Sequence, residues 1–221
     1  MKLTYKPGKL HKIHIYIDDE YRLTVDDEYW FSEKWHNLKE IDDGELAALE
    51  EAVSFRRAYN SALDLLSRRD HTKKELLRKL SQKYPKEACT AAIEKAEALG
   101  FIDEARFAEN YARELYEHKH FGMRRIQTEL QQKGIDRETA ENALEGLDKD
   151  AENRIILLLR GKYRDALSGD EKAKRRAVNG LLRLGYTYGE IRDALREYDV
   201  ETEEYDDALS LIHISEPTRR S

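Results

Sequence analysis

The side chains that could support nucleophilic or metal chemistry are few and poorly placed for it. Cys89 is the only cysteine, so an internal disulfide and a cysteine-based zinc cage are excluded. It falls in an apolar register, which favours a buried structural thiol over a nucleophile. His118 and His120 are two residues apart and so lie on different faces of a helix. His11 and His14 fall on an expected hairpin whose alternation separates them, so we predict no metal site.

Nucleotide-binding and acid–base signatures are also missing from the sequence. The pattern G-x-x-x-x-G-K-[ST] does not occur, and no G-x-G-x-x-G follows an expected strand. The chain should therefore not bind ATP through a P-loop. Carboxylates are abundant, yet none accompanies an apolar pocket motif that would tune its pKa. We expect a protein without catalytic residues and without a cofactor.

The residues with the most informative spacing are basic. Lys74, Arg124 and Arg175 take equivalent positions in three similar segments, where the second helix of each is expected to begin. Their neighbours Lys73, Arg125 and Arg176 add positive charge. A cation in the first helical turn opposes the helix dipole and costs about 0.3–1 kcal/mol. We therefore predict a row of positive helix ends that faces acidic protein surface or DNA phosphate; a merely solvated basic face is the alternative.

Other candidate contact residues have structural explanations. Arg68 and Arg69 fall at the expected end of a helix, where the dipole favours cations, so a structural role is as well supported as partner binding. Phe107, Tyr111 and Leu115 recur at positions i, i+4 and i+8. This spacing favours a core stripe over a base-stacking platform.

The elements that must position these cations repeat along the chain. Tyr84, Ile135 and Tyr186 are each 51 residues apart. Alanine follows eight residues later and an aliphatic residue nine residues later, at Ala92–Ile93, Ala143–Leu144 and Ala194–Leu195. Upstream, Leu76 and Leu80 match Ile126 and Leu130, and then Ala177 and Leu181, if the first repeat is one residue shorter. Each unit is expected to fold as three helices, and tandem units gain stability by stacking.

Several helix boundaries can be predicted from local signals. Residues 45–69 carry apolar side chains near a 3.6-residue period, which predicts a long helix. Thr72 and Glu75 form a capping-box pattern at the start of the next helix. Pro85 can open the third helix of the first unit, and Gly100 can end it in the left-handed conformation.

The N-terminal segment has a different period. Ile13, Ile15 and Ile17 alternate with polar or aromatic residues, and the alternation resumes after residue 20 with Tyr21, Leu23 and Val25. Period two with β-branched and aromatic residues predicts two strands in a hairpin. An isolated hairpin is marginally stable. The candidates for packing against it are Tyr29, Trp30, Phe31 and Trp35.

Composition limits the class of protein. Of the 221 residues, 38% are charged, and three prolines and eleven glycines are too few for a turn-rich all-β fold. No stretch approaches the roughly 20 apolar residues of a membrane span, and the N-terminus lacks the apolar region of a secretion signal. The net charge of −6 combines an acidic head (residues 1–53), a basic middle (54–198) and an acidic tail (199–221). We expect a soluble cytoplasmic protein.

These features predict an all-α class of fold, an elongated and curved array of three-helix repeats with a small hairpin extension. The expected segments are a hairpin at 1–44, a linker helix with the first repeat at 45–102, and further repeats at 103–148 and 149–199, followed by an acidic tail at 200–221. Residues 209–219 resemble a translated sequencing adapter, so no function is assigned to them.

Motifs of the first two units, in order, resemble the RecX family of recombinase regulators. They are ALDLLSRR at 62–69, TKKEL at 72–76, GFIDE at 100–104, FA at 107–108, GMRRI at 122–126, EL at 129–130 and KGI at 133–135. The resemblance covers about residues 54–198, and the hairpin resembles an extension found in Gram-positive members. The chain departs from the family at Glu104, where a second Asp is usual, and at Tyr84–Pro85, where a Gly-apolar turn is usual.

The resemblance implies three tandem three-helix repeats and binding to the recombinase RecA, mainly as a filament on single-stranded DNA. It also implies damping of ATP hydrolysis, strand exchange and co-protease action, in DNA repair and the SOS response. We expect a monomer that contacts single-stranded DNA weakly or indirectly and has no membrane partner. A direct DNA-binding helical module and a helical scaffold for another protein are the alternatives.

Overall fold

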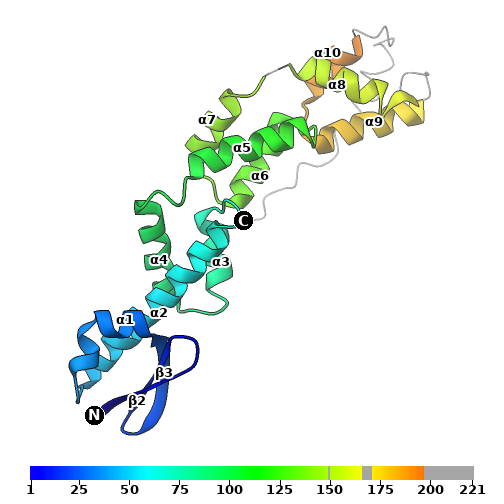
Figure 1. Ribbon diagram of the computed structural model, residues 1–221. Helices are drawn as coiled ribbons and strands as arrows, with labels where there is room; N and C mark the ends of the chain where they lie inside the picture. The colour runs from blue at the N-terminus through cyan, green and yellow to red at the C-terminus, as the bar shows by residue number, and fades with distance from the viewer. Residues whose placement is uncertain (149, 166–170, 197–221) are drawn as a thin grey trace, which may run out of the picture. The chain divides into compact units, whose positions relative to one another are not determined.

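The structure is a computed structural model that describes residues 1–148, 150–165 and 171–196. The described residues form two compact units, unit 1 (Met1–Asp103) and unit 2, which begins at Glu104. Helices predominate in both, as the sequence predicts (Figure 1). The acidic tail and its adapter-like segment lie outside the described residues.

Unit 1 begins with a three-stranded antiparallel sheet in the order β1-β2-β3. Its strands are β1 (Leu3–Pro7), β2 (Lys12–Ile17) and β3 (Glu20–Asp26). The predicted hairpin is the β2–β3 pair, and β1 adds a third strand that the sequence analysis did not predict. Strand β1 escapes prediction because Leu3 is its one buried residue and no apolar alternation marks it.

One face of the sheet carries the core of the head. Ile13, Ile15 and Ile17 point into it and are buried. Helix α1 (Asp27–Ser32) and the 3-10 helix η1 (Lys34–Asn37) supply aromatic side chains to the same core. Tyr29, Trp30 and Trp35 are buried as expected, whereas Phe31 is 51% exposed and packs edge-on against Tyr5.

Helix α2 (Asp43–Leu66) connects this core to the first three-helix group. It starts two residues earlier than predicted because Asp42 and Glu45 form a capping box. It ends three residues earlier, where the Ser67 hydroxyl donates to the Asp64 carbonyl at 2.9 Å. Leu49 and Val53 of its first half pack in the head, so one helix serves both cores.

The first group is completed by α3 (Lys73–Leu80) and α4 (Lys86–Ala98). The Thr72 hydroxyl caps α3 by accepting from the Glu75 backbone N–H, and Pro85 immediately precedes α4. Cys89 is fully buried, as predicted, and burial raises the pKa of its thiol. Gly100 follows α4 with a φ of 76°, in the expected left-handed conformation.

Unit 2 contains two further three-helix groups. The first consists of α5 (Glu104–Glu117), α6 (Met123–Lys133) and α7 (Arg137–Glu145). The second consists of α8 (Ala151–Arg160), α9 (Glu171–Leu184) and α10 (Tyr188–Arg196). Each group encloses its own apolar core. Phe107 and Leu115 are buried in the first of these cores and Tyr111 packs against it, which confirms the predicted core stripe.

The predicted 51-residue period is present in the backbone of the helix ends. Gly134 and Gly185 end α6 and α9 with φ values of 91° and 95°. The next residue in each case, Ile135 or Tyr186, is buried and donates its N–H five residues back. The third helix of each group then begins after a residue of the same register, namely Pro85, Asp136 and Thr187.

Candidate partner-binding surface

The three predicted cations keep their equivalence in the structure. Lys74, Arg124 and Arg175 are all exposed. Each lies two residues before an inward-facing position of the second helix, and those positions hold Leu76, Ile126 and Ala177, all buried. The buried register therefore fixes the direction in which each cation leaves its helix.

The prediction that all three cations start a helix is correct for two of them. Lys74 and Arg124 are the second residues of α3 and α6. Arg175 is the fifth residue of α9, because that helix begins one turn earlier at Glu171. The first turn of α9 thus carries an acidic residue, which the helix dipole favours. Arg175 and Arg176 lie beyond that turn, so the unfavourable interaction of a cation with the dipole, predicted from the sequence, does not arise for them.

In two of the pairs, the neighbouring cations Lys73 and Arg125 engage groups within the chain. The Lys73 ammonium lies 2.9 Å from the Glu97 carboxylate. The Arg125 guanidinium lies 2.7 Å from Glu129 and 5.4 Å from the centre of the Phe121 ring. These contacts give Lys73 and Arg125 structural roles in addition to any contact with a partner.

Arg124 and Arg175 differ from these paired residues. Within the described ranges, no ion pair or side-chain hydrogen bond involves either guanidinium. Each is exposed and retains all five of its donors for another molecule. Among the predicted contact residues, these two are therefore the best candidates for a partner.

Arg68 and Arg69 lie just beyond the end of α2, whereas the sequence predicts them in its last turn. Arg68 pairs with Asp64 at 2.9 Å on the surface. Arg69 lies 3.1 Å from the Glu75 carboxylate, which is itself buried and 3.1 Å from Nδ1 of His71. Burial lowers the pKa of His71, and the nearby Arg69 guanidinium lowers it further. The structure thus gives both arginines intramolecular partners.

The two basic pairs of unit 2 lie at opposite ends of α9. The Gly122 N–H, at the start of α6, donates to the Leu184 carbonyl at the end of α9 at 2.8 Å. A Cβ on Gly185 would come within 2.4 Å of the Arg125 Cβ. Arg176 and Leu184 are eight residues apart along α9, so the Arg175–Arg176 pair lies about 12 Å along the helix from the end that Arg124–Arg125 adjoin. The carbonyl end of α9 also offsets the cost of cations at the start of α6.

Arg154 of α8 connects the two groups of unit 2. Its guanidinium carbon lies 3.5 Å from the centre of the Tyr116 ring, and a terminal N–H donates to the Tyr116 carbonyl. Tyr186 donates to the His120 carbonyl at 3.1 Å. Burial raises the pKa of both phenols, and Arg154 opposes the rise. No sequence signal marked Arg154. It directly precedes the apolar residues 155–159, a position that an ordinary surface arginine can also occupy.

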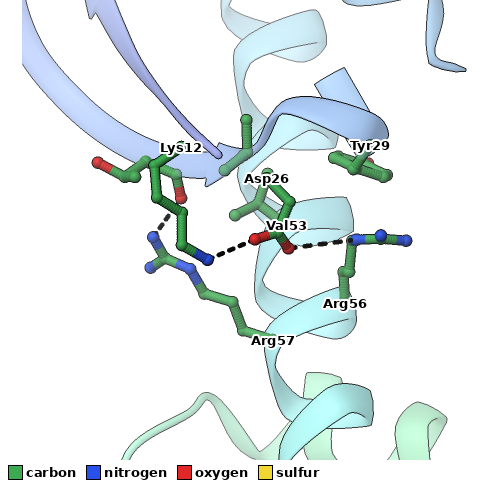
Figure 2. Close-up of a pocket in the computed structure, with 8 residues that line it drawn as sticks. Lys12, Asp26, Tyr29, Val53, Arg56 and Arg57 are labelled. Atoms are coloured by element: carbon green, nitrogen blue, oxygen red, sulfur yellow. Dashed lines mark hydrogen bonds and ion pairs between the residues drawn. The ribbon is translucent and has the colours of Figure 1, made fainter. Parts of the chain in front are cut away.

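A basic pocket in unit 1 was also missed. Figure 2 shows Lys12 on β2 and Arg56 and Arg57 on α2 converging at the edge of the sheet around Asp26. The pocket has a volume of about 100 Å³. The tandem Arg56–Arg57 was the available signal, but only the fold shows that the helix brings it to β3.

The described residues hold no group of three or more His, Cys, Asp or Glu side chains arranged to bind a metal. None of the helices described is both long and apolar enough to cross a membrane.

Together, a small β-sheet head and three three-helix groups with a shared register define a helical-repeat protein. Family models describe the same units: that of the first three-helix domain of RecX matches residues 58–95 and that of the second matches residues 103–144. The chain belongs to the RecX family.

Individual relatives agree with this assignment. The chain is 35% identical over 139 residues to the regulatory protein RecX of Stenotrophomonas maltophilia, covering 62% of this chain and 84% of the relative. It is 26% identical over 201 residues to that of Clostridium botulinum, covering 89% and 94%.

Solved structures are similar as well. A crystal structure of RecX from Lactobacillus salivarius matches with a TM-score of 0.59 and 29% identity, covering 67% of this chain and 98% of that one. Another crystal structure of a regulatory protein RecX, with a TM-score of 0.64 and 24% identity, covers 87% and 98% and shares the fold.

Proposed function

We propose that this protein regulates the recombinase RecA by binding its filaments on single-stranded DNA. Binding lowers ATP hydrolysis, strand exchange and co-protease activity, and so limits recombination, DNA repair and the SOS response. The support is membership of a family whose relatives are named regulatory proteins. The chain acts in this proposal as a cytoplasmic monomer with no catalytic step of its own.

Basic side chains of the second helices make the contact. The observation that carries this step is the exposure of Arg124 and Arg175 without an intramolecular ion pair in the described structure. A fully solvated guanidinium contributes little to folding, whereas it attracts and orients an anionic partner over several ångströms. A third cation, Lys74, takes the same register in unit 1.

Lys73, Arg125 and Arg176 support the same surface, and Arg68 and Arg69 extend it in unit 1. Because Lys73, Arg125, Arg68 and Arg69 also have intramolecular partners, their substitution combines effects on folding and on binding. We assign them a smaller share of the contact than Arg124 and Arg175.

The test is the ATPase rate of RecA assembled on single-stranded DNA, titrated with the purified full chain. The proposal expects inhibition at fewer than one copy per RecA protomer, because a bound copy blocks extension or loosens neighbouring protomers. ATPase rates unchanged up to equimolar protein would contradict it.

The alternatives have separate readouts. A helical scaffold for another protein would leave RecA unbound in a pull-down with purified components. A DNA-binding helical module would show affinity for DNA without RecA that Arg124→Glu and Arg175→Glu abolish. The proposal expects capture of RecA filaments and loss of that capture in the same variants.

A further inference from the structure

The outer face of the N-terminal sheet carries aromatic side chains that no core uses. His14 and Tyr16 alternate with the buried isoleucines of β2 and therefore point to the opposite face. Tyr21 on β3 pairs with Tyr16 in the strand register and is 59% exposed. The Tyr16 and Tyr21 rings meet edge to face with their centres 6.0 Å apart. This arrangement leaves the Tyr21 ring exposed beside the half-buried Tyr16 ring.

Cations and polar groups continue this face along the strands. The Lys6 ammonium lies 4.7 Å from the centre of the Tyr16 ring. Nδ1 of His14 lies 2.7 Å from the Thr24 hydroxyl, and the Tyr21 hydroxyl lies 3.0 Å from the same oxygen. Gly8 packs so closely against the His14 ring that a Cβ there would lie 2.5 Å from Nε2. The aromatic face is thus held in place by local contacts.

The face ends at the basic pocket of Figure 2. Lys12 donates to the Asp26 carboxylate, and Nε of Arg56 lies 3.7 Å from the other oxygen of Asp26. Arg57 donates to the Thr24 carbonyl. Nε of Arg56 is buried with no hydrogen-bond partner in the described structure. Since this Nε reaches Asp26 only through the longer ion pair and the Arg56 side chain is 35% exposed, Arg56 can donate to an acceptor from outside.

The charge of the pocket is positive although the head as a whole is acidic. Three cations, Lys12, Arg56 and Arg57, face the single carboxylate of Asp26. Thr24 and Tyr29 supply only neutral polar groups. A phosphate oxygen in the pocket would accept hydrogen bonds from Arg56, and its negative charge would offset part of the remaining positive charge. Asp27 and Glu28 follow Asp26 but do not line the pocket, and most other acidic residues of the head lie in the β2–β3 turn and between residues 40 and 51.

We propose that this surface of unit 1 binds single-stranded nucleic acid; it consists of Lys6, Lys12, His14, Tyr16 and Tyr21 of the sheet and Arg56 and Arg57 of α2. The pocket holds one phosphate of the backbone, and Tyr16 and Tyr21 receive unpaired bases. Lys12 and Tyr16 are four residues apart on β2, which places the two parts about 13 Å from each other. Stacking on aromatic side chains beside a basic groove is how single strands are bound without sequence preference. The site is independent of the contact with RecA proposed above.

The test is fluorescence anisotropy of a labelled 20-nucleotide oligothymidylate titrated with the full chain without RecA, at several salt concentrations. Tyr21→Ala removes a stacking ring and should weaken binding about tenfold. Tyr21→Phe keeps the ring and should retain the affinity. Equal affinity of Tyr21→Ala and the wild type would overturn the assignment of the aromatic face.

The pocket is tested by Arg57→Gln, with Lys83→Gln as a control, because Lys83 is an exposed cation of unit 1 far along the chain from the sheet. Losing one phosphate contact should reduce the slope of log affinity against log salt by about 0.7. The control should keep the wild-type slope. Equal slopes for both variants, or no wild-type binding at 50 mM salt, would overturn the proposal.

Four competitors identify the occupant. Unlabelled oligothymidylate should displace the probe at lower concentration than a duplex of equal length, whose bases are stacked inside. Inorganic phosphate should compete only in the millimolar range, since it fills the pocket alone. If polyglutamate displaces the probe as well as the oligonucleotide does, the face is a general polyanion or acidic-protein surface and the proposal fails.

Discussion

At the scale of single residues, the side chains with the clearest roles were those that no motif announces. Arg154 contacts Tyr116 from a neighbouring helical group, and Arg56 reaches Asp26 from another element. Their partners lie about 30 or more positions away along the chain, so no local spacing predicts the contact. By contrast, Cys89 could be placed in the core from the sequence, because a helical period fixes which face is buried.

Substituting Arg154 should loosen the junction within unit 2. Arg154→Met keeps the aliphatic stem but loses the ring contact with Tyr116 and the hydrogen bond to its carbonyl. We expect a loss of about 1–3 kcal/mol in the free energy of unfolding. Urea denaturation followed by circular dichroism measures it. The control is Arg113→Met, an exposed arginine of α5 with no side-chain partner in the described structure, and a similar stability for both variants would contradict the role of Arg154.

The buried His71 should make unit 1 sensitive to mild acid. Its pKa in the fold is lowered by burial and by the charges of Arg69 and Lys79, while the Glu75 carboxylate opposes the shift. The unfolded chain therefore binds a proton at His71 at a higher pH than the folded chain does. The contribution of His71 to stability is complete above the unfolded pKa of about 6.5 and is lost as the pH falls below it.

The measurement is the free energy of unfolding between pH 5 and 8, for the wild type and for His71→Asn. Asn keeps a polar group near Glu75 and removes the titration. The variant should lose less stability than the wild type over this range. His118→Asn, which removes an exposed imidazole, is the control, and parallel profiles for the wild type and His71→Asn would contradict the account.

At the scale of elements, helices were more predictable than strands or helix starts. The end of α4 was placed correctly before Gly100 because glycine in the left-handed conformation is a local signal. Strand β1 was missed since its side chains are mostly exposed. The start of α9 was placed one turn too late because the repeat register was followed, and in α9 the cations do not lie in the first turn as they do in α3 and α6. The miss of β1 occurs where tertiary pairing with β2 decides the element.

Three glycines separate the effects of backbone conformation and of close packing. Gly100 has a φ of 76° and open space around it, so Gly100→Ala should cost about 1–2 kcal/mol. Gly122 has an ordinary φ of −76°, but a Cβ would lie 2.6 Å from the Gly185 backbone. Gly122→Ala should cost about 1–3 kcal/mol. Gly185→Ala combines both effects and should cost about 2–5 kcal/mol.

Thermal and urea unfolding of the three variants measure these costs. Gly146→Ala is the control, because the nearest atom to an added Cβ is 3.9 Å away and the φ is −76°. It should be close to neutral. If Gly185→Ala were no more destabilising than Gly100→Ala, the contact between α6 and the end of α9 would not hold the groups of unit 2 together.

At the scale of the whole molecule, the sequence predicted the succession of a β head and three helical groups. A register repeated every 51 residues carries that information, and the family models match its first two units. Function could be predicted only in outline, because the eight cations proposed from spacing differ in the structure. Several form ion pairs within the chain, whereas Arg124 and Arg175 are exposed without one in the described structure; these two are called the open cations. Whether a cation forms an ion pair depends on carboxylates such as Glu97 and Glu129, which the fold places next to Lys73 and Arg125.

The electrostatic contact proposed for the filament should be sensitive to salt. The basic side chains are exposed, so raising the ionic strength from 0.05 to 0.3 M screens their attraction. We expect the rate of association with RecA filaments to fall more than the rate of dissociation rises, because exposed charges mainly steer the encounter. Surface plasmon resonance on immobilised filaments measures both rates. A dissociation rate that carries most of the salt effect would contradict steering.

The central claim is that open cations of the second helices contact the filament. Its most direct test is the affinity of the Arg124→Glu, Arg175→Glu double variant for RecA filaments on single-stranded DNA, measured by co-sedimentation at moderate salt. The control is Arg113→Glu, with circular dichroism to verify that each variant folds. We predict at least a tenfold loss of affinity for the double variant and wild-type affinity for the control. A folded double variant that binds as tightly as the wild type would contradict the account.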